Sequence, residues 1–333
     1  MNINEIAKLA GVSRATVSRY LNNGYVSEEK KQRIREVIEK TGYKPSTQAQ
    51  VLRTKKSKII GVIVPKISSE AIARITEGIS DVLAAQGYQM LLANTENKVE
   101  KELEYLNLFL NNPVDGIVFV ATIFTKQHKA IFKKMTVPIV IVGQKYGDYP
   151  CVYHDDYGAA KALTLRMLES GKRNIGCVGV TERDEAAGRQ RILGYLDAMK
   201  AYGYDGRDKI IEAEFRLESG YVKMAELMKR CPGLDGVFCA TDNIAVGAVQ
   251  YLKAAEYQVP EDIAVVGVGH NRISRVLTPK LTTAHLYHKK SGEEGAKMLL
   301  EMIEQQTLIS KQLQLGYEII DGESVTKAET EEI

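Results

Sequence analysis

The sequence predicts an all-α helix-turn-helix headpiece followed by an α/β core of two lobes built on parallel sheets. Three observations support this fold class. The first 22 residues have the pattern of a helix-turn-helix, and from Ile59 onward apolar strand-like runs alternate with amphipathic helices. Residues 1–58 hold 13 Lys/Arg against 5 Asp/Glu, although the whole chain carries only +3. A basic end on a mildly acidic body indicates that the end meets a polyanion.

The first segment predicts two short helices joined by a tight turn. Apolar residues recur at helical spacing in the first helix, at Ile3, Ile6, Ala7 and Leu9. Gly11 suits the turn, and Ser13 is a good N-cap for a second helix whose apolar stripe is Val17 and Leu21. Such a pair of helices typically reads DNA with the second helix; the alternative is a generic helical hairpin.

A third helix and a linker complete this region. The helix should begin after Ser27, bury Ile34, Val37 and Ile38, and stop at Thr41-Gly42, which gives a headpiece of residues 1–45. Residues 46–58 contain a helix-compatible stretch and a basic linker. Because so short a helix is unstable alone in water, we expect this hinge to be helical when bound and frayed when free.

The core is predicted from the alternation of buried strands and helices. The expected strands are Ile59–Pro65, Gln89–Ala93, Gly116–Ala121, Ile139–Gly143, Ile175–Val180, Gly236–Ala240 and Ile263–Gly267. The expected helices are Ile72–Gln86, Glu100–Leu110, Ala159–Ser170, Gly188–Tyr202, Ser219–Arg230 and Ala245–Ala255. This order is typical of parallel sheets with right-handed crossovers.

Two successive sets of these elements predict two lobes within a core of residues 59–327. We expect Leu286–Gln306 to be a further helix and Leu313–Ile320 a late strand. The first lobe is then about 59–157 plus 286–312, and the second about 158–284 plus 313–327. Residues 328–333 form a polar tail.

Composition excludes several classes of protein. No apolar stretch of 18 residues and no charged-then-apolar leader is present, which favours the cytoplasm over a membrane or export. The four cysteines are spread out without the spacing of a zinc or redox site, so they indicate buried thiols and neither a metal nor a cofactor. An enzyme on a doubly wound fold is disfavoured because no Gly-x-Gly-x-x-Gly follows the first strand. A secreted sugar-binding protein is disfavoured by the basic headpiece.

Seven motifs in fixed order resemble one known family. They are Ile6-Ala-Lys-Leu-Ala-Gly-Val-Ser-Arg-Ala-Thr-Val-Ser-Arg19, Gly42-Tyr-Lys-Pro45, Ala49-Gln-Val-Leu52, Val114-Asp-Gly-Ile117, Arg191-Ile-Leu-Gly194, Ala240-Thr-Asp-Asn243 and Leu277-Thr-Pro-Lys-Leu-Thr-Thr283. From Ile3 to about Val325 the chain resembles the lactose/galactose repressor family of transcriptional regulators. The resemblance implies a core like a periplasmic sugar-binding protein, with three crossovers between lobes. It also implies a homodimer on double-stranded, pseudo-palindromic operator DNA.

The resemblance assigns contacts to DNA. It places Arg14, Ala15 and Arg19 at base-reading positions, where Arg can pair with guanine and Ala can touch a thymine methyl. The alternative for either Arg is a nonspecific phosphate contact. The other implied contacts are Ser13, Thr16 and Ser18 to phosphates, Asn22 on the same face, and Ala49 and Leu52 in the hinge. Leu52 corresponds to the family's minor-groove wedge, or it packs against the partner hinge.

A small ligand is expected in the cleft between the lobes, at the carboxyl ends of the strands. The candidate effector-binding residues are Ser69, Gln144, Asp155, Arg191, Thr241, Asp242 and His270. Arg191 matches the family's effector arginine, and a guanidinium can donate to two neighbouring hydroxyls. Asp155 and Asp242 could instead cap helices.

Two departures bear on the identity of the ligand. The family's aromatic pair is replaced by Ser69-Glu-Ala-Ile72, so an apolar shelf is missing or supplied elsewhere. The usual acceptor carboxylate is lost from the run Val268-Gly-His-Asn271, where His270 or Asn271 could replace it. Gly143-Gln144 and Gly267-Val-Gly269 are similar to the sucrose- and trehalose-responsive branch.

The sequence therefore predicts a repressor of carbohydrate-utilisation genes whose effector is a sugar or sugar phosphate. Effector binding would close or twist the lobes and so decide whether the hinge helices pair. The alternative within DNA binding is a global carbon-control regulator gated by a protein partner.

Overall fold

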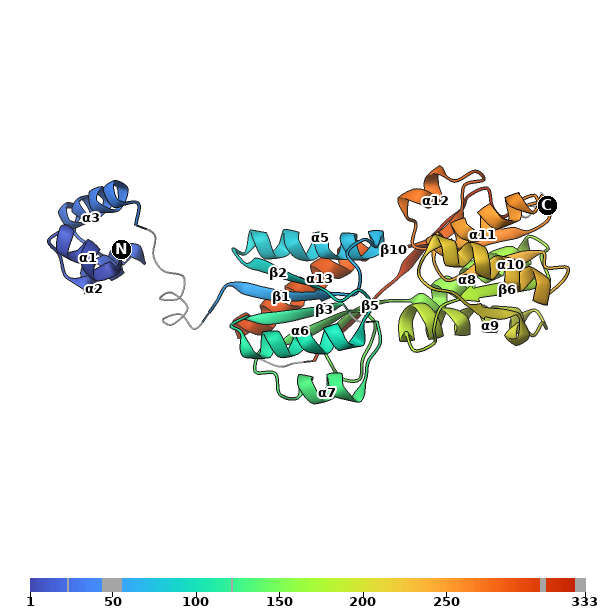
Figure 1. Ribbon diagram of the computed structural model, residues 1–333, viewed down its shortest axis with the longest axis horizontal. Helices are drawn as coiled ribbons and strands as arrows, with labels where there is room; N and C mark the ends of the chain where they lie inside the picture. Colours follow the sequence, from blue (N-terminus) through green and yellow to red (C-terminus); the bar gives the residue numbers. More distant parts are fainter. Residues whose placement is uncertain (23, 44–55, 121, 306–309, 327–333) are drawn as a thin grey trace, which may run out of the picture. The chain divides into compact units, whose positions relative to one another are not determined.

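The computed structural model describes residues 1–22, 24–43, 56–120, 122–305 and 310–326 (Figure 1). Contacts divide the chain into two compact units, Met1–Lys58 and Ile59–Ile333. The predicted hinge helix with Ala49 and Leu52, and the tail 328–333, lie outside the described residues.

The first unit contains three helices, α1 (Ile3–Leu9), α2 (Arg14–Leu21) and α3 (Glu28–Thr41). The predicted caps are confirmed: the Ser13 hydroxyl accepts from the Thr16 amide at 3.2 Å, and Gly42 ends α3 with φ +63°. Ile6, Val17 and Ile34 are fully buried at the centre of this unit. Leu9, the last residue of α1, is 59% exposed.

The first lobe of the second unit is a six-stranded parallel sheet in the order β11-β5-β4-β3-β1-β2. Its strands are β1 (Ile59–Val64), β2 (Gln89–Asn94), β3 (Gly116–Val120), β4 (Ile139–Gly143), β5 (Cys151–His154) and β11 (Gln312–Leu315). Its helices are α5 (Glu70–Ala85), α6 (Val99–Asn111), α7 (Lys126–Phe132) and α13 (His288–Gln305). In Figure 1, α5 and α13 cover one face of this sheet, and α6 and α7 cover the other.

The second lobe repeats the plan, with the order β12-β10-β9-β8-β6-β7. Its strands are β6 (Ile175–Gly179), β7 (Ile210–Glu212), β8 (Gly236–Cys239), β9 (Ala264–Val268), β10 (Thr282–Leu286) and β12 (Tyr317–Ile320). Its helices are α8 (Asp156–Glu169), a π-helical turn (Glu185–Gln190), α9 (Arg191–Ala201), a 3-10 turn (Arg207–Lys209), α10 (Leu217–Arg230), α11 (Asp242–Ala254) and α12 (Arg272–Val276). The edge strand β12 runs antiparallel to β10, whereas the other pairs are parallel.

Buried apolar residues fill both faces of each sheet. In β3, Val118 packs toward α5 and α13, while its neighbours Ile117 and Phe119 pack toward α6 and α7. This alternation follows from the two-residue repeat of a strand, and both faces are apolar because helices cover both.

Glycines allow α5 and α13 to cross closely. A Cβ atom on Gly292 would lie 2.0 Å from the Ile75 carbonyl oxygen, and one on Gly78 would lie 2.1 Å from the Lys289 carbonyl oxygen. Any larger residue at these two positions would force the backbones apart. The glycines therefore allow α13 to pack directly against α5, although some 200 residues separate the two helices in the sequence.

The chain passes between the lobes three times: from β5 to α8, from β10 to α13, and from β11 to β12. The fold class is confirmed, but the single late strand Leu313–Ile320 is wrong. The chain divides at Gly316, so that β11 joins the first sheet and β12 the second. Residues 313–315 therefore belong to the first lobe and not to the second.

Candidate functional site

The outer face of α2 presents most of the predicted DNA-contacting residues to solvent. Arg14, Ala15 and Arg19 are exposed, and neither arginine forms a salt bridge with a described residue. The Ser13 and Thr16 hydroxyls hydrogen-bond each other at 2.9 Å, so they fix the start of α2. At its end the Asn22 side-chain amide donates to the Ser18 carbonyl oxygen. The result is a short, capped helix with two exposed guanidinium groups that no described carboxylate pairs with.

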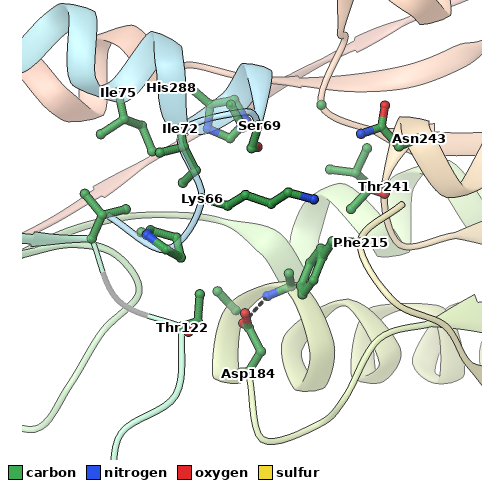
Figure 2. Close-up of a pocket in the computed structure, with 18 of the residues that line it drawn as sticks. Lys66, Ser69, Ile72, Ile75, Thr122, Asp184, Phe215, Thr241, Asn243 and His288 are labelled. Carbon is green, nitrogen blue, oxygen red and sulfur yellow. Dashed lines mark hydrogen bonds between the residues drawn. The ribbon is translucent and has the colours of Figure 1, made fainter. Parts of the chain in front are cut away.

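A cavity of about 200 Å³ lies where the carboxyl ends of both sheets face each other. The first lobe contributes residues at or just after the ends of β1, β3, β4 and β5, and the second contributes residues at or after the ends of β6, β7, β8 and β9. Figure 2 shows Lys66, Ser69 and Thr122 from the first lobe facing Asp184, Phe215 and Thr241 from the second. The site is therefore complete only when both lobes are present.

Arg191 is a buried charged residue that lines this cavity. It stands at the point where the π-helical turn becomes α9, and only 7% of it is exposed. Its Nε donates to Asp156 Oδ1 at 2.8 Å, its Nη2 lies 2.7 Å from the same oxygen, and its Nη1 donates to the Ala240 carbonyl oxygen. The carboxylate compensates the buried charge, and two of the five guanidinium N–H groups have no such partner among the described residues.

Three buried polar atoms on residues that line the cavity have no hydrogen-bond partner among the described residues. They are His154 Nε2, His288 Nδ1 and Asn271 Oδ1. Each such atom costs about 1–3 kcal/mol. Burial also lowers the pKa of both His154 and His288, so the imidazoles are neutral and offer one donor and one acceptor each. A ligand rich in hydroxyl groups has the donors and acceptors to satisfy them.

Apolar walls close the cavity on two sides. Ile72 and Ile75 project from α5, and Phe215 faces them from the loop after β7 (Figure 2). The sequence left open how the missing aromatic pair is compensated. Here the apolar surface comes from aliphatic side chains of one lobe and an aromatic ring of the other.

The predicted effector residues divide into three groups. Ser69, Arg191 and Thr241 line the cavity. Gln144 and Asp155 line a neighbouring cavity of about 680 Å³, in which Gln144 donates to the Thr122 carbonyl oxygen and Asp155 caps α8 through the Gly158 amide. Asp242 and His270 line neither cavity.

Asp242 and His270 instead make contacts within the protein, at the loop that follows β9. Asp242 is fully buried and accepts from the Thr283 hydroxyl at 2.6 Å and from the Asn271 amide at 2.7 Å. Burial raises the pKa of this carboxyl. Thr241, not Asp242, caps α11. His270 packs its ring against His285, and the neighbouring Asn271 faces the cavity.

Contacts between the lobes lie beside the same loop. Glu70, in the first turn of α5, pairs with Arg74 at 2.5 Å and accepts from the Arg272 amide at 2.9 Å. That amide belongs to the first residue of α12, whose own N-cap Asn271 makes no side-chain cap. A side chain of one lobe thus caps a helix of the other.

Sequence reasoning missed Lys66, His154, Asp156, Asp184, Phe215 and His288. Lys66 closely follows the first predicted strand, a signal that was available. His154 ends β5 and Phe215 follows β7, and the sequence analysis predicted neither of these strands. Asp156 was not distinguishable from Asp155, because only the geometry of the helix start decides which carboxylate caps α8. His288 begins the helix that follows the crossing from β10, a position visible only once the lobes are assembled.

Asp184 makes the stability of the core depend on pH. Burial raises the pKa of Asp184 to about 6. The stability that its protonated form contributes to the core is therefore fully present below about pH 4 and is lost as the pH rises through 6. Asp184→Asn keeps the cap to the Ala187 amide but removes the charge. We compare the unfolding free energy of the variant with that of wild type at two pH values. This difference should favour the variant by about 2–4 kcal/mol more at about pH 7.5 than at about pH 4.

Urea denaturation of both proteins across that pH range tests this expectation. The other titrating groups cancel in the difference between wild type and variant. A difference that stays constant with pH would show that Asp184 has an ordinary pKa.

The described residues contain no group of three or more His, Cys, Asp or Glu side chains able to hold a metal ion. No helix in the described part of the chain is long and apolar enough to cross a membrane.

Comparisons with known proteins agree with this architecture. Residues 2–46 match the family model for "Bacterial regulatory proteins, lacI family", and residues 164–325 match that for a periplasmic binding protein-like domain. The chain is 34% identical over 307 residues to the sucrose operon repressor of Staphylococcus xylosus, covering 92% of this chain and 95% of that protein.

Two solved structures extend the comparison to three dimensions. A complex of the transcriptional regulator CelR with cellobiose is 26% identical, with a TM-score of 0.76 over 97% of this chain and 99% of that one. The lac repressor dimer bound to operator and the anti-inducer ONPF is 20% identical, with a TM-score of 0.88 over 97% and 98% of the two chains. The second likeness concerns the fold alone.

Proposed function

Because the chain belongs to the lacI family of bacterial regulatory proteins, we propose that it represses carbohydrate-utilisation genes under the control of a small sugar. The protein is a DNA-binding transcriptional regulator and not an enzyme. The sugar is assigned to the cavity between the lobes, and the protein acts as a cytoplasmic homodimer on operator DNA. The observation that carries this proposal is the cavity itself, with buried polar atoms that have no partner in the described chain.

The geometry supports a coupling between effector and operator. The cavity draws residues from both lobes, so a ligand that contacts both favours one arrangement of the lobes over another. That change would alter the spacing of the two linkers at residues 46–58 and decide whether the hinge segments pair. A coupling of about 1–3 kcal/mol changes operator affinity about 5–150-fold.

A titration of operator DNA with purified protein tests this proposal. The operator is first selected from random DNA, and mono- and disaccharides are then added one by one. We expect at least one sugar to change operator affinity within the range given above. If no sugar does so while a protein partner does, the effector assignment fails and the protein is a partner-gated regulator.

We assign base reading to Arg14, Ala15 and Arg19, and phosphate contacts to Ser13, Thr16 and Ser18. The exposure of the first three residues on one capped helix supports this division. Asn22 extends the same face, and Ala49 and Leu52 are assigned to the operator centre by the family pattern alone.

Substituting Arg14 with Ala should relax sequence preference at one base pair in each half-site. A bidentate contact to guanine contributes about 1–3 kcal/mol of discrimination, so the preference there should fall about 5–150-fold. Binding to a set of single-base operator variants measures it. Lys30→Ala is the matched control, because it removes the same charge from an exposed position on α3. If Arg14→Ala lowers the affinity for every operator variant by the same factor, as Lys30→Ala does, then Arg14 contacts a phosphate and does not read a base.

A further inference from the structure

We infer that the cavity between the lobes responds to pH through the buried pair His154 and His288: a proton on this pair opens the lobes and weakens effector binding. This inference rests on the proposed function and adds a means of regulation to the same site. His154 ends β5 just before the chain crosses to α8, and His288 begins α13 just after the crossing from β10. Two of the three connections between the lobes therefore carry one member of the pair each.

The two imidazoles contact each other and have little access to solvent. Their ring centroids lie 5.1 Å apart, with an angle of 79° between the ring planes. His154 is 5% and His288 is 8% exposed, and His154 Nε2 and His288 Nδ1 have no hydrogen-bond partner among the described residues. Both residues line the cavity, and Figure 2 shows His288 at its edge. Separation of the lobes would therefore let water reach both rings, and a charged imidazole gains most from that water.

The surroundings of the pair keep both rings neutral. Burial is the main cause that lowers the pKa of His154 and that of His288. The charged and titratable groups that act on the pair come from four elements, and they are Asp156 of α8, Arg191 of α9, Arg74 of α5 and His285 of β10. Of these only Asp156 favours a proton, and Arg191 already pairs with that carboxylate at 2.7 Å. A proton on either ring would therefore be a buried positive charge without a counterion of its own among these groups.

The neighbouring histidines His270 and His285 are less suited to this role. Their ring centroids lie 5.3 Å apart, both side chains are half-buried, and neither residue lines the cavity. The other charged groups that act on them are Arg74, Arg275, Glu70 and Glu318. Burial lowers the pKa of both rings, but Glu318 favours a proton on them and lies opposite His285 in the pairing of β10 with β12. Because neither residue lines the cavity, opening of the lobes changes their surroundings less than those of the buried pair.

Acidification therefore favours open lobes. We call the arrangement in the structure closed, because Glu70 of the first lobe accepts from the Arg272 amide of the second. A histidine in water has a pKa of about 6.5, so each ring of the buried pair takes up a proton below that pH only when the lobes open. The closed arrangement is then favoured above about pH 6.5 and loses stability as the pH falls.

The size of this effect follows from the number of rings that titrate. One or two histidines should lower the ratio of closed to open molecules about 10- to 100-fold between about pH 7.5 and about pH 5.5. Asp184 lines the same cavity and acts in the opposite direction, because burial raises the pKa of its carboxyl to about 6. That carboxyl favours the closed arrangement by at most about fourfold over the same range, so a net loss of at least about threefold remains.

Hydrogen exchange at the Arg272 amide tests the inference on the full-length protein without added sugar. This amide donates to Glu70 Oε2 of the other lobe at 2.9 Å, so its protection reports on the closed arrangement. After correction for the intrinsic exchange rate, its protection factor should fall at least about threefold between about pH 7.5 and about pH 5.5. The amides of β3, a strand buried within the first lobe, should keep theirs.

The double variant His154→Gln with His288→Asn removes both titrating rings and keeps a polar side chain at each position. Its protection at Arg272 should not fall over this pH range. His270→Asn is the matched control, because it removes a histidine that lines neither cavity, and it should keep the wild-type fall. Constant protection in wild type would overturn the inference whether or not the double variant folds. An equal loss of the pH effect in His270→Asn would overturn it as well.

The operator titration at both pH values separates this inference from the proposed function. A sugar that changes operator affinity at about pH 7.5 should bind at least about threefold more weakly at about pH 5.5. If a sugar acts equally at both pH values, the proposed function holds and the inference is wrong. If no sugar acts at either pH, the proposed effector is wrong, whereas exchange at Arg272 still decides whether acid opens the lobes.

Discussion

Arg191→Met is expected to lower the unfolding free energy of the core by about 3–5 kcal/mol and to abolish the response to effector. The loss follows from Asp156, which is 4% exposed and would be left as an uncompensated buried carboxylate. The Ala240 carbonyl oxygen at the end of β8 would lose its guanidinium donor as well. Urea denaturation gives the stability, and the sugar titration on operator DNA gives the response.

The double substitution Arg191→Met with Asp156→Asn separates the two effects. Removing both charges should recover most of the stability, because no buried charge is left unpaired. It should not recover the effector response, since no guanidinium remains to donate to the ligand. A cost below about 1 kcal/mol for the single variant would mean that solvent reaches Asp156 and that the pair does not stabilise the core.

The architecture of the core was predictable because its physical causes are local. Strands such as β3 and β9 are apolar on both faces, and helices such as α5 and α10 carry one apolar stripe, so each leaves a pattern in the sequence. The short elements leave no such pattern. β7 has three residues and α12 has five, and each is held by neighbours that the sequence does not reveal.

The division of the late strand at Gly316 has a similar cause. Residues 313–320 form one β-prone run, and nothing in that run states which sheet each half will join. Pairing with β5 on one side and β10 on the other decides it, and both pairings join segments far apart in sequence. A long-range partner therefore set the lobe boundary that the local pattern placed three residues too early.

The candidate site was predictable only to the level of its strand ends. The rule that ligands bind at the carboxyl ends of parallel strands pointed to Ser69, Arg191 and Thr241, and these three residues line the cavity. The rule could not tell which of two adjacent carboxylates lies at the cavity. In the structure Asp155 caps α8, whereas Asp156 pairs with Arg191. At Asp242 a buried hydrogen-bonding role, shared with Thr283 and Asn271, took the place of a ligand contact.

Ile34→Ala is expected to weaken operator binding about tenfold or more while leaving the effector cavity intact. Ile34 is fully buried on α3 against Ile6 and Val17. Truncating a buried isoleucine costs about 2–5 kcal/mol, whereas a unit of this size has about 3–9 kcal/mol of stability in total. Much of the headpiece should then be unfolded at 37 °C, and operator affinity should fall about tenfold or more.

Two measurements on one variant make this prediction specific. Proteolysis should cut the Ile34→Ala protein rapidly within residues 1–58, while sugar binding to Ile59–Ile333 stays within about twofold of wild type, since the two units fold around separate cores. Glu39→Ala, at an exposed position of the same helix, should change neither. Weakened sugar binding in Ile34→Ala would show that the headpiece core supports the effector cavity. Retained operator binding would show that α2 reads DNA without the packing of α3 behind it.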